Sequence, residues 1–158
     1  GERKWMTLQG QVYGAGMTNA VLIGGVADFL RRCRDHEVDV YIVSHKTEFG
    51  HFNSTRTNLR DASLAWMEAL GFFDREGFAL ARDRVFFEST RDAKIARIAS
   101  IKCTHFIDDL EEIFRDPAFP PTAAAYLLAA GTGSLPRGPF KAYRTWQDIS
   151  DDILGDPR

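Results

Sequence analysis

The chain has little excess charge, few cysteines and no long apolar run, and each absence excludes a class of protein. Its 20 basic and 22 acidic residues give a formal net charge of −2, which is not the basic footprint of a nucleic-acid-binding protein. No apolar stretch approaches the ~20 residues that span a bilayer, and the N-terminal sequence GERKWMTLQG lacks the apolar core of a signal peptide. Two cysteines are too few for a disulfide scaffold. We therefore expect a cytoplasmic protein without a nucleic-acid or membrane partner.

Three common ligand motifs are also missing from the sequence. GTGSLPRG, at 131–138, is rich in glycine but lacks the Gly-Lys-Ser/Thr ending of a phosphate-binding loop, and no Gly-x-Gly-x-x-Gly follows a predicted strand. The four histidines have no zinc-site spacing, and His105, within a predicted strand, is interpreted as a hydrogen-bonded core residue. Cys33 and Cys103 are interpreted as small buried hydrophobic residues.

What is present is the composition of one globular domain. At 158 residues with 44% hydrophobic and 27% charged content, the chain is about one domain long and buries roughly 70% of its unfolded surface. We expect a single domain over residues 1–158. Residues 1–20 place apolar side chains among glycines, and we interpret them as a cap or a linker segment.

Helical and strand patterns alternate along the chain. Val26, Phe29, Leu30 and Cys33 recur at the spacing of one helix face. The strand VDVYIV follows, and the later elements are a helix ending at Gly71, the strand RVFFE, a helix capped by Thr90, the strand THFI and a C-terminal helix capped by Thr145. This alternation predicts an α/β fold with a doubly wound parallel sheet in three α/β/α layers. AAAYLLAAG, at 123–131, fits either a strand or a buried helix.

Polar residues stand where two of the predicted strands end. Ser44 follows VYIV, and Asp108 with Asp109 follows THFI. Ligands of open parallel sheets bind outside the carboxyl ends of the strands. Two adjacent carboxylates repel each other unless a cation offsets them, and an oxygen-rich pair suits Mg²⁺ rather than zinc. Lys94 lies in the first turn of a predicted helix, where the helix dipole disfavours a cation, and this placement suggests a function.

In this order, Ser44, Lys94 and the pair Asp108 and Asp109 resemble the second, third and fourth motifs of the haloacid dehalogenase (HAD) superfamily. The resemblance covers roughly residues 20 to 115. It implies a Rossmann-like fold and a Mg²⁺-dependent phosphohydrolase. It also implies that Ser44 and Lys94 hold the transferring phosphoryl group as catalytic residues, while Asp108 and Asp109 hold the metal.

The first motif of that family is missing from this sequence. It is a strand ending in Asp-x-Asp, which carries the nucleophile, and the first aspartate here is Asp28, on a predicted helix. We expect the motif upstream of Gly1. This chain alone would then lack the central strand of the sheet and would be inactive.

The segment SHKTEFGHFNSTRTN, at 44–58, follows a strand end and should lie over the site. We therefore expect His45, Lys46, His51 and Arg56 to bind the substrate. The alternative is a solvated loop whose charges are incidental.

Each site residue also has an ordinary structural explanation. Ser44 could be a turn or cap residue, Asp108 and Asp109 could cap the short helix LEEIF, and Lys94 could be a solvated helix lysine. Together, the residues predict hydrolysis of a small phosphomonoester through an aspartyl-phosphate. The alternative is a non-catalytic binding or scaffolding domain. Oligomeric state is not indicated.

Overall fold

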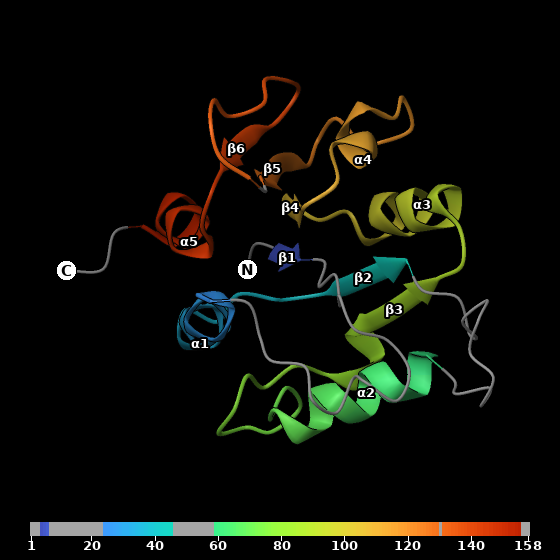
Figure 1. The fold of residues 1–158 in the computed structure, drawn as a ribbon. Helices are drawn as coiled ribbons and strands as arrows, with labels where there is room; N and C mark the ends of the chain where they lie inside the picture. The colour runs from blue at the N-terminus through green and yellow to red at the C-terminus, as the bar shows by residue number, and fades with distance from the viewer. Residues whose placement is uncertain (1–3, 7–23, 46–58, 130, 156–158) are drawn as a thin grey trace.

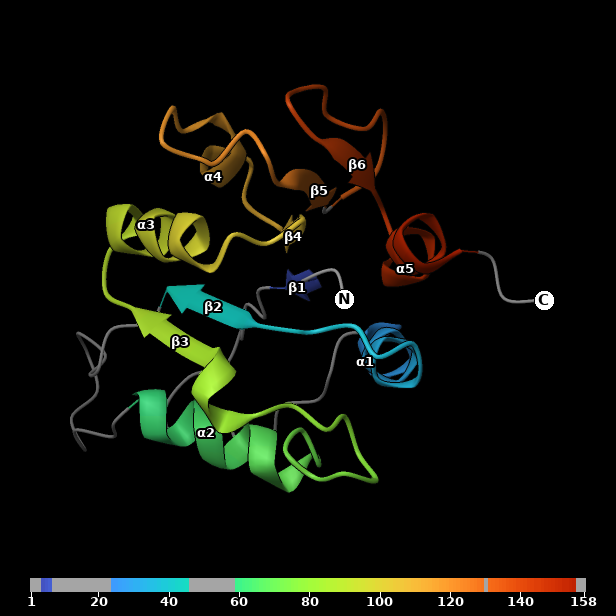
Figure 2. The ribbon, with the colours of Figure 1, turned by 180° about the vertical axis from the view of Figure 1, so that it is seen from behind.

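The fold is a parallel sheet with helices on both of its faces (Figures 1 and 2). The computed structural model describes residues 4–6, 24–45, 59–129 and 131–155. The strands are β1 (Lys4–Met6), β2 (Ile42–His45), β3 (Val85–Glu88), β4 (His105–Asp108), β5 (Ala124–Leu128) and β6 (Lys141–Tyr143). The helices are α1 (Val26–Asp35), α2 (Leu59–Ala69), the 3-10 turn Arg82–Arg84, α3 (Arg91–Ile101), α4 (Glu111–Arg115) and α5 (Trp146–Leu154).

The strands lie in the order β3-β2-β1-β4-β5-β6, and every neighbouring pair is parallel. Parallel neighbours need a crossover connection, usually a helix, and helices do connect β2 to β3, β3 to β4 and β4 to β5. The predicted α/β class with a parallel sheet is therefore confirmed.

The N-terminal strand β1 lies in the middle of this sheet. Met6 is in register with Ile42 of β2, and β1 pairs with β4 from Lys4↔His105 to Met6↔Ile107. Within the described residues the sheet is thus continuous, where the sequence had predicted a gap left by a missing strand. Of the segment 1–20, which we had interpreted as a cap or a linker, Lys4–Met6 belongs to the sheet.

Each face of the sheet has its own core, because successive strand residues point to opposite sides. Ile42 belongs to the cluster under α1, α2 and α5, whereas Val43 belongs to the cluster under α3 and α4. Both side chains are fully buried, as expected of a parallel sheet covered on both faces. These are the three predicted layers.

The predicted caps are present in the structure. The hydroxyl of Thr90 accepts a hydrogen bond from the Ala93 N–H at 3.0 Å, and Thr145 does the same for the Asp148 N–H at 3.1 Å. Gly71 follows α2 with a φ of 81°. The strand predicted over VDVYIV begins later, at Ile42. Val40 is nevertheless buried, so its apolar character reflects burial rather than pairing.

The C-terminal third resolves what the sequence left open. The segment that fitted either a strand or a helix forms β5, and β6 was not predicted. Cys33 and Cys103 are buried thiols outside any disulfide, as expected. His105 is half-buried, pairs with the Thr104 hydroxyl at 2.6 Å and stacks on Tyr126. Among the helices that the structure describes, none has both the length and the apolar composition of a membrane span.

Candidate functional site

The candidate site lies at the carboxyl ends of the central strands. In the sheet, β2 and β3 lie on one side of β1, and β4, β5 and β6 lie on the other side. The boundary between β1 and β4 is therefore a topological switch point, where open α/β sheets bind ligands outside their carboxyl ends. Asp108 is the last residue of β4. Its carboxylate thus stands beside this switch point.

Asp108 forms a buried ion pair with Lys94. The Lys94 ammonium donates to Asp108 Oδ2 at 2.7 Å, and both side chains have no exposed surface. The other carboxylate oxygen, Oδ1, accepts the Leu110 N–H at 3.1 Å. Leu110 is the N-cap residue of α4, which has no side-chain cap, so the interpretation of Asp108 as a cap of this helix is wrong: one of its oxygens holds the backbone before the helix, and the other binds a cation.

Lys94 reaches Asp108 because the inner face of α3 includes it. Lys94, Ile95, Ile98 and Ile101 are the buried residues of this helix, and the Lys94 ammonium also lies 5.9 Å from the Phe106 ring centroid. A lysine on a buried face is costly unless it is paired. The interpretation of Lys94 as a solvated surface lysine is therefore wrong.

Asp109 differs from its neighbour because solvent reaches its side chain. Partial desolvation, a hydrogen bond with Asp108 and repulsion by that carboxylate raise the pKa of Asp109 to about 6, while backbone bonding and the Lys94 ammonium oppose the shift. The two carboxylates thus share one small region, where a further cation would favour the ionised form of Asp109.

Ser44 also lies at the carboxyl ends of the strands. It belongs to β2, on the opposite side of β1 from β4. Ile42 and Ile107 are level, since each is in register with Met6. Ser44 is two residues beyond Ile42, and Asp108 is one residue beyond Ile107. Their backbones are therefore separated by two strand spacings, roughly 10 Å. Ser44 is buried, and the structure places it at the edge that carries the ion pair.

The expected substrate-binding loop lies almost entirely outside the described residues. His45 is the last residue of β2, but its side chain is not described, and Lys46, His51 and Arg56 belong to the undescribed segment 46–58. Their proposed roles stay predictions.

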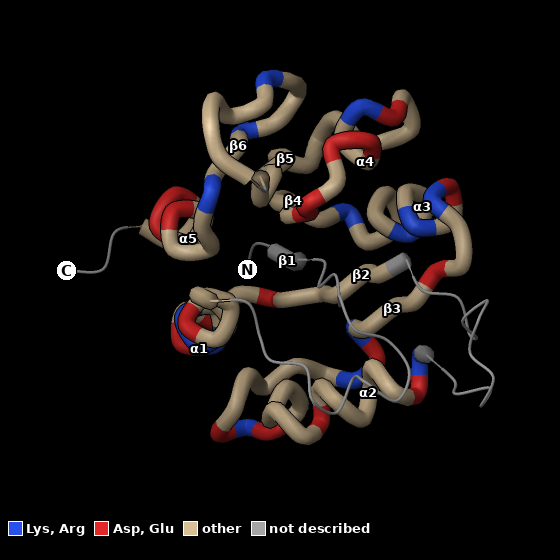
Figure 3. The backbone as a smooth tube through the Cα atoms, viewed as in Figure 1, with Lys and Arg blue, Asp and Glu red and all other residues tan. Residues whose placement is uncertain are grey.

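A hollow of about 310 Å³ opens beside Lys94, between α3 and the start of α4. Its lining residues are Arg91, Lys94, Leu110, Glu112 and Ile113. Figure 3 shows basic residues along α3, with acidic residues following β4 and starting α4. Of the lining residues only Lys94 was predicted to belong to a site, and Arg91, Leu110, Glu112 and Ile113 were not. Leu110 could have been noticed, because an apolar residue directly after an acidic pair is unusual for a helix cap.

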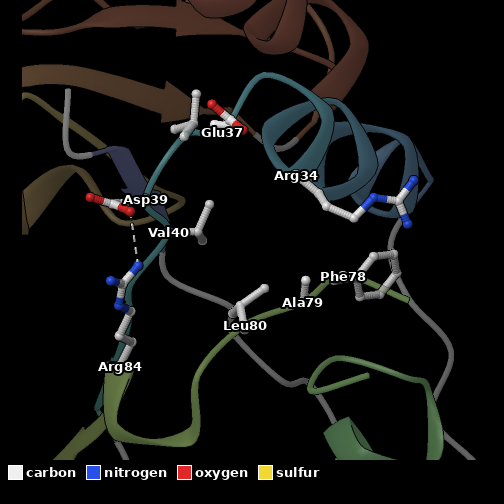
Figure 4. A pocket seen from close by; sticks show the side chains of 9 residues that line it. Arg34, Glu37, Asp39, Val40, Phe78, Ala79, Leu80 and Arg84 are labelled. Carbon is white, nitrogen blue, oxygen red and sulfur yellow. Dashed lines mark hydrogen bonds and ion pairs between the residues drawn. The ribbon is translucent and has the colours of Figure 1, made fainter. Parts of the chain in front are cut away.

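A second hollow, of about 220 Å³, lies at the amino ends of the strands, where β2 and β3 begin (Figure 4). Arg84 is paired with Asp39 at 3.1 Å, and Arg34 donates to the backbone carbonyls of Glu76 and Gly77. These two arginines are already engaged within the protein. This hollow is far along the strands from the Lys94–Asp108 pair, and we assign it no chemistry.

The acidic pair is compatible with Mg²⁺ but does not by itself form a complete metal site. Among the residues that the structure describes, no group of three or more His, Cys, Asp or Glu side chains could hold a metal. Mg²⁺ is commonly bound through one or two carboxylates, with water and substrate phosphate completing its octahedron. Asp109, whose carboxyl is exposed, fits such a site, whereas Asp108 is buried and its two oxygens are already bonded to Lys94 and to the Leu110 N–H.

No protein-family model matches the chain, and no curated protein matches its sequence. A function has to be inferred from the chain's own residues and their geometry.

Proposed function

We propose that this chain is the phosphate- and metal-binding part of a Mg²⁺-dependent phosphohydrolase of the HAD type, acting on a small phosphomonoester. The observation that carries the proposal is the buried Lys94–Asp108 pair at the switch point of a parallel sheet. A fully buried ion pair stabilises a fold little, since desolvation offsets its attraction. Buried ionisable groups in such a place are more typical of a functional site.

Each residue of the site has a distinct role in this proposal. The Lys94 ammonium, which has no exposed surface in this structure, offsets charge on the phosphoryl oxygens from behind the site, and the buried Ser44 hydroxyl would have to become accessible to donate a hydrogen bond to one of them. Asp109 would hold Mg²⁺, with Asp108 as a ligand only if its buried carboxylate gave up one of its present partners, and the bound metal would offset the negative charge of the phosphate. Asp108 also keeps the Lys94 ammonium at the edge of the site through the 2.7 Å hydrogen bond.

The nucleophile is not among these residues. The proposal places it on an Asp-x-Asp strand upstream of Gly1, where its carboxylate would attack phosphorus, break the ester P–O bond, release the alcohol and form an aspartyl-phosphate. Water would then hydrolyse that intermediate. This chain alone would bind phosphate and Mg²⁺ without turnover.

The position of β1 favours a second candidate, a non-catalytic phosphate-binding domain. β1 already fills the central place in the sheet, and the residues that follow it in the sequence are Thr7, Leu8 and Gln9, none of which is a carboxylate. The coding sequence upstream of Gly1 separates the two. An apolar strand ending in Asp-x-Asp supports the hydrolase, whereas a start codon without such a strand supports the binding domain.

Both candidates require phosphate binding, which calorimetric titration of this chain with inorganic phosphate and Mg²⁺ tests. We expect Mg²⁺ to strengthen phosphate binding, and Asp109→Asn to remove that Mg²⁺ dependence. Asp109 is exposed, so the substitution should leave the fold intact. The matched control is Asp35→Asn, at an exposed aspartate ending α1 on the opposite edge. If neither ligand binds, or if both variants behave alike, the proposal is wrong.

A further inference from the structure

The hollow beside Lys94 has a chemistry that the phosphate site does not need. Phosphate recognition uses cations and hydrogen-bond donors, yet the hollow also exposes Leu110, and the side chain of Ile113 lines it. Leu110 is one of three large hydrophobic residues exposed among the described residues, at 42%. A single exposed leucine is ordinary, but this one lies next to the buried ion pair.

The position of Leu110 is fixed by the site itself. Its N–H donates to Asp108 Oδ1 at 3.1 Å, and its backbone is extended, with φ −109° and ψ 113°. The same carboxylate therefore holds the Lys94 ammonium through one oxygen and the Leu110 backbone through the other. The cation and the apolar wall of the hollow are held by a single side chain, so their relative placement is built into the fold.

The charged residues that line the hollow do not favour a ligand of either charge. Arg91 contributes a cation and Glu112 an anion, while the Lys94 charge is balanced by Asp108. A strongly anionic or cationic group would meet repulsion from one side. What remains is apolar surface from Leu110 and Ile113.

We propose that this hollow receives the alcohol part of the phosphomonoester, and that this part is an uncharged, largely apolar group rather than a polyol or a second anion. The inference rests on the function proposed above. The phosphoryl group lies beside Arg91 at the start of α3, with the buried Lys94 ammonium behind it, and the attached carbon chain extends over Leu110. The hollow, at about 310 Å³, is at the small end of the range for ligand pockets, which suits a short chain or one ring.

Binding to this chain tests the inference without requiring turnover. The probes are inorganic phosphate and n-butyl phosphate, each titrated calorimetrically in Mg²⁺. Each buried methylene contributes about fourfold in affinity, so we expect n-butyl phosphate to bind at least about tenfold more tightly than phosphate. Leu110→Ser should lower n-butyl phosphate affinity several-fold and leave phosphate affinity unchanged. Serine retains the backbone N–H that Asp108 binds.

Leu135→Ser is the matched control, because Leu135 is also 42% exposed and lies in a loop away from the hollow. It should change neither affinity. If phosphate binds but n-butyl phosphate binds no more tightly, or if both leucine variants behave alike, the inference is overturned while the proposed function stands. If the wild-type chain binds no phosphate, the proposed function fails and the inference fails with it.

Discussion

The ammonium of Lys94 and the carboxylate of Asp108 meet at 2.7 Å with no exposed surface on either side chain. They come from the first turn of α3 and the last residue of β4. The pair joins α3 to β4 at the carboxyl ends of the strands. Because neither charge reaches solvent in this arrangement, each depends on the other, and the consequence can be measured.

Removing either partner should be strongly destabilising. Lys94→Met leaves a buried carboxylate, and Asp108→Asn leaves a buried ammonium while its amide oxygen can still accept the Leu110 N–H. We expect each to lower the free energy of unfolding by about 3–5 kcal/mol. The double variant has no unpaired charge, so its loss should be smaller than the sum of the single losses by about 1–3 kcal/mol. Urea unfolding measures all four proteins.

If the stability losses of the two single variants add up to the loss of the double variant, the two side chains do not depend on each other. Lys102→Met serves as a control, since Lys102 is exposed after the far end of α3. It should change stability by less than about 0.5 kcal/mol.

Asp109 should make stability depend on pH in the opposite sense from a salt-bridged carboxylate. Its pKa is raised from 3.8 to about 6 in the folded protein. As pH rises between these values, the unfolded chain releases the proton while the folded protein retains it, so stability falls. Above about pH 6 both states are ionised and the loss is complete. Below about pH 3.8 both are protonated and there is no loss.

Asp109→Asn cannot titrate, so the variant should be the more stable protein at about pH 7.5. We expect a difference of about 1 kcal/mol, because solvent screens an exposed side chain. The difference should shrink as the pH is lowered toward about 4. Thermal unfolding in the presence of a chelator, at intervals over this range, measures it. A difference that stays constant with pH would mean that the Asp109 carboxyl titrates normally.

Much of this fold could be predicted because local signals and periodicity agreed. Thr90 and Thr145 cap the helices that they were expected to cap, and the stripe from Val26 to Cys33 is buried. The ends of strands β2 and β4 could be read from the change of apolar into polar residues, which placed Ser44 and Asp108 at one edge. These features could be predicted from residue spacing because each depends on residues that are close together in the sequence.

Other features depend on contacts between distant segments. Nothing local in Lys4–Met6 indicated a central strand, since its pairing with β2 and β4 is tertiary. The sequence alone also did not show that Asp108, the last residue of β4, is buried while Asp109, just after the strand, is exposed. The hollow beside Lys94 forms where α3 lies next to the start of α4. Local sequence patterns do not indicate which helices lie next to each other, so this hollow could not be predicted.

The Thr90 cap should affect ligand binding as well as stability, because it fixes the turn of α3 that carries Lys94. Its hydroxyl accepts the Ala93 N–H at 3.0 Å, directly before Lys94 in the chain. Thr145 makes the equivalent bond at 3.1 Å to start α5, so the two threonines form a matched pair. Each Thr→Ala change should lower the free energy of unfolding by about 1 kcal/mol. Phosphate affinity, measured calorimetrically in Mg²⁺, should fall several-fold in Thr90→Ala and remain unchanged in Thr145→Ala. Equal phosphate affinity in both variants, at equal stability loss, would show that the first turn of α3 does not position a phosphate-binding group.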